Sequence, residues 1–466
     1  MVVKIYDTLS KKKKILKPLN NKELKIFSCG PTTYNYIHIG NARTFTFFDT
    51  VVKYLKYKGY KVFYLQNITD IDDKIINKAV ELKITPKAVA EQFERYYYED
   101  MKALGINSIS KYARATSYIE EIKSQIKRLI EKGYAYETND GVYFEVSKFK
   151  DFGKLSHQDL NQIKEHSRIE ANENKKNSED FVIWKKKKFE YEPSWPSDFK
   201  DGRPGWHIED TAITEKEFGP QYDIHGGGID LIFPHHEAEI AQMESLSNKP
   251  LVSIWMHSGF LNLSNEKMSK SLGNVFTLRE MLRKYPSAHL RYVFLSTKYT
   301  KPLEFTLEVM DNAKNSLDRI NEVIIKLNNY KNAIKDNRKI KSLIKKTRSE
   351  FEKQMDDDFE VPNAISVLFN FITEINPIIS TYSLSTKDSK LLLAFFGELN
   401  NILGIFNMSE IEIPNEIRDL VQKRDDARKN KNFKLADEIR ESIKKKGYYI
   451  DDSVQGSSII KKLSDF

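Results

Sequence analysis

The sequence predicts an α/β protein with a doubly wound, Rossmann-like parallel sheet, interrupted by an insertion and followed by a helical bundle and a small C-terminal module. Three observations carry this prediction. The first 110 residues alternate between strand-like and helix-like patterns, residues 164–180 form a polar stretch that breaks the alternation, and helical periodicity takes over from about residue 305. Alternating strands and helices are typical of a parallel sheet with helices on its faces.

The first strand–helix–strand unit lies between residues 25 and 69. Residues 25–28 form a short strand-like run that ends at Cys29-Gly30-Pro31, and residues 61–69 are again rich in strand-forming side chains. A helix is expected between them and should end at Gly59, because apolar residues recur there at helical spacing: Phe48, Val51, Val52 and Leu55. A crossover of this length predicts a βαβ unit of a parallel sheet.

The rest of the chain divides by composition. The polar residues 164–180 predict an exposed insert, and glycine-rich strand and loop patterns return at residues 202–228. An apolar stripe at helical spacing predicts a helix of the bundle, at Leu317, Ile320, Ile324 and Leu327. The expected domains are residues 1–110 and 201–304 as the two halves of the α/β domain, 111–200 as the insertion, 305–405 as the bundle and 406–466 as the terminal module.

Length and composition place the chain among globular proteins. Its 466 residues correspond to about three domains, and 40% hydrophobic with 30% charged residues excludes collagen-like and wholly disordered chains. Cys29 is the single cysteine, so an intramolecular disulfide is excluded, and we find neither a secretory signal nor an apolar run that could span a bilayer. We therefore expect a cytoplasmic protein. The net charge of +9 indicates a polyanionic partner only weakly.

One motif follows the first predicted strand and opens the first helix. It runs from Pro31 to Asn41 and contains His38, Ile39 and Gly40. A small residue there lets the backbone approach a ligand, and the start of the helix offers free N–H groups to a phosphate. His38 and Asn41 would share the first turn and could both donate to a triphosphate. An ordinary strand-to-helix turn with a surface histidine has the same pattern, so this motif alone decides nothing.

A second motif is Lys267-Met268-Ser269-Lys270-Ser271. Two lysines three residues apart, with small hydroxyl residues beside them, form a cationic loop that can neutralise charge on a phosphoryl group in the transition state. A polar surface turn is the alternative. The pair of motifs, in this order, resembles the two signature motifs of class I aminoacyl-tRNA synthetases. Asn41 stands where the first signature has its second histidine, so it can donate a hydrogen bond but cannot become cationic.

A third constellation is rich in metal-ligating residue types. It comprises residues 206–210 (Trp-His-Ile-Glu-Asp), 225–231 (His-Gly-Gly-Gly-Ile-Asp-Leu) and 233–239 (Phe-Pro-His-His-Glu-Ala-Glu). If Pro234 starts a helix, His235 and Glu239 face the same way, which suits joint metal ligation. Cys29 ends the first strand, where an open α/β sheet binds its ligands.

This arrangement resembles the cysteinyl-tRNA synthetase family, and the resemblance runs nearly end to end. It includes residues 67–74 (Asn-Ile-Thr-Asp-Ile-Asp-Asp-Lys), 355–359 (Met-Asp-Asp-Asp-Phe) and 425–428 (Asp-Asp-Ala-Arg). The resemblance implies one zinc ion per chain, held in the family by two cysteines, a histidine and a glutamate. Three of these ligands correspond to Cys29, His235 and Glu239, and the fourth falls on Asp210, where the family has cysteine.

Aspartate at position 210 changes the expected zinc site without abolishing it. A carboxylate binds zinc at about 2.0–2.2 Å and a thiolate at about 2.3 Å, and each carries one negative charge when bound. We therefore expect zinc to be retained, with harder ions such as Mn²⁺ or Co²⁺ competing better than at a second thiolate. Loss of the metal is the alternative. Zinc would separate cysteine from serine by chemistry, because a thiol ionises on the metal far more readily than a hydroxyl.

The resemblance also implies the reaction and the roles of residues. The carboxylate of L-cysteine attacks ATP, which is accompanied by Mg²⁺, and the cysteinyl group then passes to a terminal ribose hydroxyl of tRNA(Cys). The residues expected to stabilise charge on the phosphates are His38, Asn41, Lys267 and Lys270. ATP would also meet Gly40, Asp230 and Ser269. The residues expected around the bound cysteine are Cys29, Thr69, Trp206 and His225.

The C-terminal half is expected to hold the tRNA, with the bundle contacting it and the terminal module reading the anticodon. From Val421 to Gly447 there are ten Lys and Arg against five Asp and Glu, a balance that favours phosphate contacts. The candidate cations are Lys423, Arg424, Arg428, Lys429 and Lys431, although each could be an ordinary surface charge. The insertion is expected near the acceptor end of the tRNA. Neither a membrane nor an obligate protein partner is indicated.

Three other functions remain open from the sequence. A cysteine ligase of the mycothiol pathway resembles the catalytic half but lacks the anticodon-binding end. A non-catalytic RNA-binding paralogue would have no need to keep both phosphate motifs. A zinc hydrolase would account for the His-His-Glu cluster but not for residues 267–271.

Overall fold

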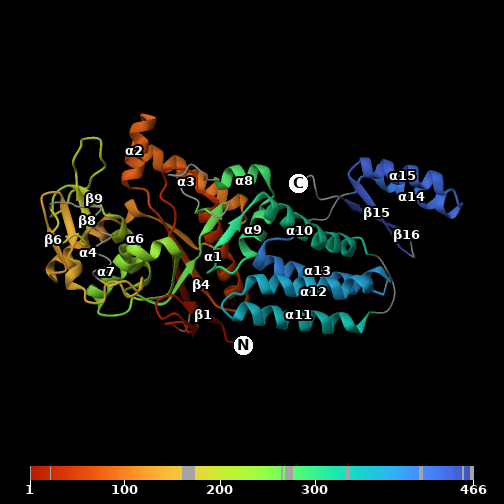
Figure 1. Cartoon of the computed structure of the whole chain (residues 1–466), viewed down its shortest axis with the longest axis horizontal. Helices are drawn as coiled ribbons and strands as arrows, with labels where there is room; N and C mark the ends of the chain where they lie inside the picture. The colour runs from red at the N-terminus through yellow and green to blue at the C-terminus, as the bar shows by residue number, and fades with distance from the viewer. Residues whose placement is uncertain are drawn as a thin grey trace. The chain divides into compact units, whose positions relative to one another are not determined.

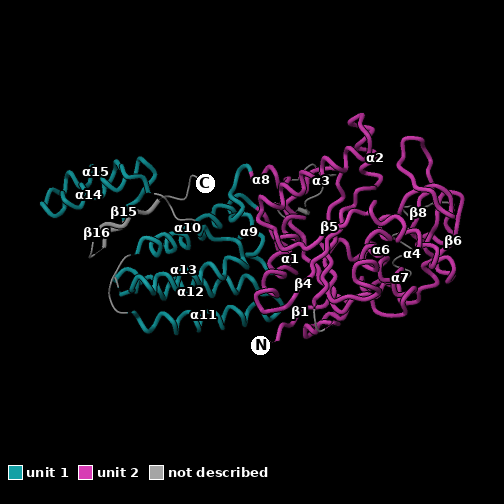
Figure 2. The backbone as a smooth tube through the Cα atoms, turned by 180° about the vertical axis from the view of Figure 1, so that it is seen from behind, with its two compact units in different colours: residues 1, 283–298, 306–466 teal, residues 2–282, 299–305 magenta. Residues whose placement is uncertain are grey.

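The computed structural model divides into two compact units, which are described separately (Figures 1 and 2). The N-terminal unit comprises residues 2–282 and 299–305, and the C-terminal unit comprises residues 283–298 and 306–466. The structure describes residues 2–20, 23–159, 174–263, 266–267, 276–330, 336–381, 383–408, 413–453 and 456–461. For residues 266–267 and 451–461 it describes the backbone alone.

A five-stranded parallel sheet organises the N-terminal unit. Its strand order is β11-β10-β3-β4-β5. Starting from β3, the chain adds β4 and then β5 on one side, and later adds β10 and then β11 on the other side. The direction in which strands are added therefore reverses between β3 and β10. This is the doubly wound arrangement that the sequence predicts. β5 lies in this sheet, just beyond the boundary expected at residue 110. The strands are β3 (Leu24–Ser28), β4 (Val62–Ile68), β5 (Lys111–Arg114), β10 (Tyr222–Gly228) and β11 (Val252–Ser258).

Helices cover both faces of the sheet. Phe27 of β3 is paired in register with His225 and packs in one apolar cluster with Ile213 and Ile240 of two helices. On the other face, a Cβ added to Gly226 would lie 2.0 Å from the ring of Phe48, so the glycine lets a third helix rest directly on β10. Helices of this unit are α1 (Ile39–Tyr57), α2 (Asp73–Leu82), α3 (Pro86–Ala103), α4 (Ile119–Glu131), α6 (Trp206–Phe218) and α7 (Glu237–Ser247).

The predicted crossover between β3 and β4 is confirmed. Helix α1 begins after the N-cap residue His38, and its predicted apolar stripe is buried. Gly59 adopts φ +88°, in the left-handed region, directly after the helix ends. β3 and β4 pair in parallel, with Leu24 opposite Val62.

The insertion forms a four-stranded sheet together with Gly202–Pro204, which lies just beyond its expected end, and shares a core with helices α6 and α7. Ile126, Phe144 and Trp184 are fully buried in one cluster. The prediction that residues up to 180 form an exposed insert is wrong for Asp180, which is buried because it accepts hydrogen bonds from the Val146 backbone and the Tyr136 hydroxyl. The antiparallel strands are β6 (Ala135–Glu137), β7 (Gly141–Phe144), β8 (Phe181–Lys186) and β9 (Gly202–Pro204).

Smaller elements complete the N-terminal unit. A hairpin of β1 (Lys4–Asp7) and β2 (Lys12–Ile15) begins the chain. A second small sheet pairs β12 (Leu261–Leu263) with β13 (Glu266–Lys267) and with β14 (Leu303–Phe305). Helix α8 (Leu278–Lys284) closes the long first segment of the unit.

The C-terminal unit is helical, as predicted. The stripe predicted from Leu317 to Leu327 is buried on α10, and Gly404 with φ +65° ends α13. No helix among the described residues is long and apolar enough to cross a membrane. The elements are α9 (Ser287–Leu295), α10 (Leu307–Asn328), α11 (Arg338–Asp356), α12 (Val361–Ser380), α13 (Thr386–Leu403), α14 (Asn415–Lys429), α15 (Phe433–Lys445), β15 (Tyr448–Ser453) and β16 (Gly456–Lys461).

Asp7 ties the N-terminal hairpin to strand β11. Its carboxylate is fully buried and accepts hydrogen bonds from the backbone N–H of Trp255 at 2.9 Å and of Ser10 at 3.0 Å, and it pairs with Lys14 at 2.6 Å. Burial alone would raise the pKa of Asp7, but these donors outweigh it and leave the pKa below its usual value.

We expect this carboxylate to stabilise the fold above its unfolded pKa of about 3.9, with the contribution lost as the pH falls through the lower folded value. The substitution Asp7→Asn removes the charge at every pH. The difference in the free energy of unfolding between the wild type and Asp7→Asn should therefore be constant near neutrality and shrink in acid. Urea titrations across this range measure the difference, and a gap that grows in acid contradicts the assignment.

Candidate active site

A pocket of about 300 Å³ opens at the carboxyl edge of the sheet, where the strand order reverses. This is the place at which open α/β sheets bind their ligands. Its lining comes from the end of β3, the start of α1, the residues after β10 and β11, and the first residue of α6. Pocket residues include Cys29, Gly30, His38, Gly40, Asn41, Thr44, Trp206, Gly228, Asp230 and Phe260.

One part of the pocket has the character of an anion site. His38 caps α1, and its Nδ1 accepts the backbone N–H of Asn41 at 3.2 Å, which leaves Nε2 of the neutral ring as the donor. Gly40 and Asn41 line the same wall, and Asp230 lines another. A Cβ on Gly228 would lie 2.5 Å from Asp230 Oδ1, so the glycine makes room for that carboxylate. Lys267 ends β13 with its side chain undescribed, and Ser269 and Lys270 lie outside the described residues.

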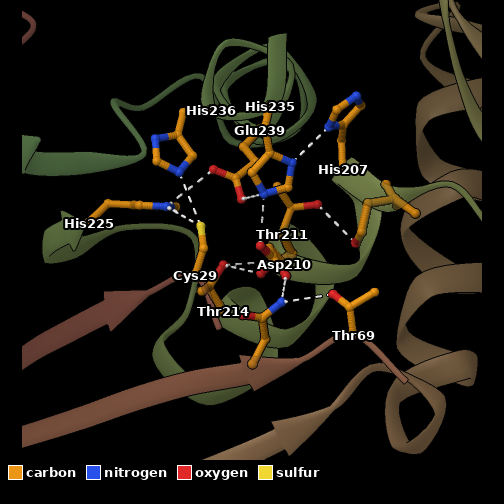
Figure 3. Close-up of polar contacts among 12 residues, drawn as sticks. Cys29, Thr69, His207, Asp210, Thr211, Thr214, His225, His235, His236 and Glu239 are labelled. Carbon is orange, nitrogen blue, oxygen red and sulfur yellow. Dashed lines mark hydrogen bonds and ion pairs between the residues drawn. The ribbon is translucent and has the colours of Figure 1, made fainter. Parts of the chain in front are cut away.

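Four ligand-type side chains converge at Cys29, which is the one of the four that lines this pocket (Figure 3). They are Cys29, Asp210, His235 and Glu239, all buried, and each offers an atom within 4.8 Å of the others. His235 Nε2 lies 3.0 Å from Asp210 Oδ2 and 3.5 Å from Glu239 Oε1. They come from three places in the fold, namely the end of β3, the first turns of α6 and the start of α7.

The expectation that a helix starts at Pro234 agrees with the backbone. Phe233 adopts an extended conformation with φ −132° and ψ 133°, as a residue before proline prefers. It is the one residue of 232–236 with non-helical backbone angles, and the turn that contains His235 and His236 leads directly into α7, which begins at Glu237. His235 and Glu239, four residues apart, therefore face the same way.

The acidic groups of this cluster are buried with too few hydrogen-bond donors and positive charges among the described residues around them to compensate their negative charges. Burial, with the charges of Asp210 and Glu239, raises the pKa of the Cys29 thiol well above its usual value. Burial and Asp210 likewise raise the pKa of Glu239. Neither oxygen of Glu239 accepts a hydrogen bond from a donor in the described part of the chain. One sulfur, one imidazole and two carboxylates with free lone pairs suit a divalent cation in four-fold coordination.

Neutral histidines surround the sulfur. His236 Nε2 lies 3.1 Å and His225 Nε2 3.6 Å from Cys29 Sγ, and burial lowers the pKa of both rings well below the usual value. Each ring is oriented through its other nitrogen, His236 by His257 at 2.8 Å and His225 by the Tyr222 hydroxyl at 2.7 Å. Sequence reasoning missed His236, whose only signal was its place beside His235.

Trp206 and Thr69, both expected near bound cysteine, lie in different surroundings. Trp206 is 38% exposed, lines the pocket, and stacks on the ring of His235 with centroids 4.2 Å apart. Thr69 is buried and is not among the residues that line the pocket. Its hydroxyl lies 3.4 Å from the amide nitrogen of Asn67. Asn67 itself was not singled out from the sequence, yet it also contacts Asp210.

The cations expected to bind phosphate on the terminal module are not all accessible. Arg424 is 2% exposed and lies 3.8 Å from the carboxylate of Asp425, so its expected contact with phosphate is wrong. It points inward because its position falls on the apolar face of α14, with Val421 and Ala427. The candidate cations that are exposed are Lys423, Arg428, Lys429 and Lys431.

Comparison with known proteins gives the class of this fold and site. Residues 15–315 match the model "tRNA synthetases class I (C) catalytic domain", and residues 350–407 match the DALR domain. A Mycobacterium tuberculosis methionyl-tRNA synthetase solved with methionyl-adenylate shares the fold, with a TM-score of 0.61 at 15% identity over 82% of this chain and 88% of that chain. Residues 15–315 are thus the catalytic domain of a class I aminoacyl-tRNA synthetase.

Curated relatives narrow the class to one family. The cysteine–tRNA ligase of Thermoplasma volcanium is 48% identical over 96% of this chain and 97% of its own length. That of Methanococcus vannielii is 42% identical over 99% of this chain and 100% of its own. The chain belongs to the cysteine–tRNA ligase family. The matched length includes the C-terminal module. This match disfavours the alternative of a mycothiol-pathway cysteine ligase, which resembles the catalytic half alone.

Glu237 and Glu239 provide a matched test of the four-residue cluster. Both are buried near the start of α7, but Glu237 accepts the backbone N–H groups of Leu155 and Ser156 and lies outside the cluster. We expect Glu239→Gln to weaken zinc binding at least about tenfold, since loss of a ligand should cost no less than loss of an outer partner. Glu237→Gln should bind as the wild type does. Metal analysis after equilibrium dialysis measures both, and equal losses would contradict the cluster.

Proposed function

We propose that this chain joins L-cysteine to tRNA(Cys) and selects the amino acid with a zinc ion held by Cys29, Asp210, His235 and Glu239. The observation that carries the zinc proposal is the buried convergence of these four side chains, one of which, Cys29, also lines the pocket where the strand order reverses. Family membership supports the ligase activity. The cytosol, where ATP and tRNA are found, is the proposed location.

The first half-reaction forms an activated amino acid. The carboxylate of cysteine attacks the α-phosphorus of ATP, so that pyrophosphate leaves and cysteinyl-adenylate forms. His38 Nε2 and the N–H groups at the start of α1 would donate to the phosphate oxygens as their charge grows, and the location of His38 in the pocket lining supports this role. Asn41 would donate a hydrogen bond there without a positive charge. Lys267 and Lys270 are proposed to share this task, with Mg²⁺ bound to the nucleotide, and Asp230 is proposed to accept a hydrogen bond from a ribose hydroxyl.

The second half-reaction transfers the cysteinyl group to tRNA. A ribose hydroxyl at the tRNA 3′ end attacks the acyl carbon, and the phosphate of AMP leaves. No side chain is needed as a nucleophile, because positioning and electrostatic stabilisation dominate this chemistry. Trp206 is proposed to cover bound cysteine and to exclude water, and its partial exposure in the pocket and its stacking on His235 support this role.

The amino acid is selected at the proposed zinc centre. A bound zinc ion would act as a Lewis acid that binds the thiolate of cysteine far more readily than the hydroxyl of serine. The chain's own contribution is to hold the ligand atoms together and to keep the surrounding rings neutral. His225 and His236 present ring nitrogens to Cys29 Sγ without adding positive charge that would compete with a cation.

The C-terminal unit is proposed to bind the tRNA. The helical bundle at residues 305–405 and the module at residues 406–466 would contact the tRNA body and the anticodon, and the insertion at residues 111–200 would meet the acceptor end. Exposed cations on and just after α14 support this proposal, because phosphate contacts dominate affinity for nucleic acid.

Selection by zinc predicts a coupled loss of metal and of specificity. In pyrophosphate exchange into ATP, cysteine should outperform serine by at least about a hundredfold, which a pocket sensing size alone barely achieves. Asp210→Ala should lose zinc and narrow the ratio, mainly by slowing exchange with cysteine. Glu237→Gln serves as the control. A metal-free chain that keeps its full preference for cysteine would contradict the proposal.

Charge reversal on the terminal module tests the tRNA surface. Replacing Lys423, Arg428, Lys429 and Lys431 together with Glu should raise the KM for tRNA at least several-fold, and more at low salt, because phosphate contacts are lost. Pyrophosphate exchange, which needs no tRNA, should not change and thereby reports that the catalytic unit is intact. An unchanged KM for tRNA contradicts the assignment of this surface.

A further inference from the structure

We propose that Asn67 is a positioning residue that fixes which oxygen of Asp210 serves as a metal ligand. This inference rests on the zinc centre proposed above and adds to it a residue that touches neither substrate nor metal. Asn67 lies near the end of β4, is hydrogen-bonded to Asp210 of the cluster, and is 1% exposed. Its side chain links the two ligand-bearing segments that contain Cys29 and Asp210.

The orientation of the Asn67 amide follows from its partners. Oδ1 accepts the backbone N–H of Gly30 at 2.5 Å, and a backbone N–H can only donate. The amide oxygen must therefore face Gly30, and Nδ2 must face the other way. Nδ2 donates to Asp210 Oδ1 at 2.5 Å and lies 3.4 Å from Thr69 Oγ1.

One oxygen of Asp210 is therefore engaged by Asn67, and the other faces the cluster. Oδ1 accepts the amide of Asn67, while Oδ2 lies 3.0 Å from His235 Nε2, inside the four-residue cluster. A free carboxylate can bind a cation through one oxygen or through both. With Oδ1 engaged, Asp210 offers a cation the single donor atom Oδ2.

The same amide also sets the spacing between two ligands. Gly30 follows Cys29, so the bond from Gly30 N–H holds the end of β3 against β4. A Cβ on Gly30 would lie 1.9 Å from the backbone oxygen of Asn67, so only glycine permits this approach. Asn67 therefore holds the Cys29 segment with its oxygen and Asp210 with its nitrogen.

The proposal predicts that the effect of Asn67 depends on the chemistry of residue 210. A carboxylate is a strong acceptor for an amide N–H, whereas sulfur accepts weakly and has no second donor atom to restrain. Removing the amide should therefore matter for Asp210 and matter much less for a thiolate in its place. A purely structural role of Asn67, exerted through Gly30, would be the same in both backgrounds.

A double-mutant cycle on the full-length chain tests this dependence. The wild type, Asn67→Ala, Asp210→Cys and the double variant are titrated with zinc against a chromophoric chelator. We expect Asn67→Ala to weaken zinc binding about 10–100-fold beside Asp210, as loss of an outer partner does, and less than about threefold beside a cysteine. Cobalt(II) in place of zinc gives a second readout. Its visible bands should weaken in Asn67→Ala, because two-oxygen binding by Asp210 raises the coordination number.

Asn67→Asp guards against a folding defect. It keeps an oxygen for the Gly30 N–H but replaces the donor that faces Asp210 with an acceptor, so it should bind zinc no better than Asn67→Ala. Wild-type zinc affinity in either variant overturns the proposal, as does an equal loss in both backgrounds while the unsubstituted chain binds one zinc. If the unsubstituted chain binds no zinc in this titration, the metal centre proposed above fails, and the role of Asn67 fails with it.

Discussion

The interaction on which the site depends is the mutual repulsion of three acidic groups that the fold buries together. Cys29, Asp210 and Glu239 lie within 4.8 Å of one another, with His235 as the fourth member. Taking their charges out of water is costly unless an opposite charge is present, and the raised pKa values of Cys29 and Glu239 express that cost. A divalent cation relieves the repulsion, and neutral His225 and His236 leave the compensation to that cation.

The parallel sheet explains why this cluster lies beside the start of helix α1, which is proposed to bind phosphate. A single connection, from the end of β3 to the start of α1, has Cys29 at its beginning and His38 at its end. Because β10 is the neighbour of β3 on the other side, the residues that follow it close the same pocket. The order of the strands thus brings the residues proposed to bind the thiol and those proposed to activate the carboxylate to the same edge of the sheet.

Two positions give this chain its own character within that frame. Asn41 cannot become cationic, so the donors at this part of the pocket are the N–H groups at the start of α1 and Nε2 of His38, whose Nδ1 accepts the Asn41 backbone N–H. Asp210 has two oxygens where a thiolate has one sulfur. The contact with Asn67 engages one of these oxygens, and the proposed metal site would have a harder donor set than one with a second thiolate.

The sequence by itself determined the helices and strands and the residue types that can bind a metal. Strand and helix periodicity depend on neighbouring residues alone, and the metal-binding capacity of cysteine, histidine and carboxylate side chains follows from residue type. It predicted the β3–α1–β4 crossover, and it marked Cys29, Asp210, His235 and Glu239 as ligands through their resemblance to a known family. Periodicity could not show that Arg424 and Asp180 turn inward, or that His236 and Asn67 meet residues distant in the chain. Those outcomes were decided by tertiary packing, since the partner of a buried polar group is whichever donor or acceptor the fold brings within about 3 Å of it.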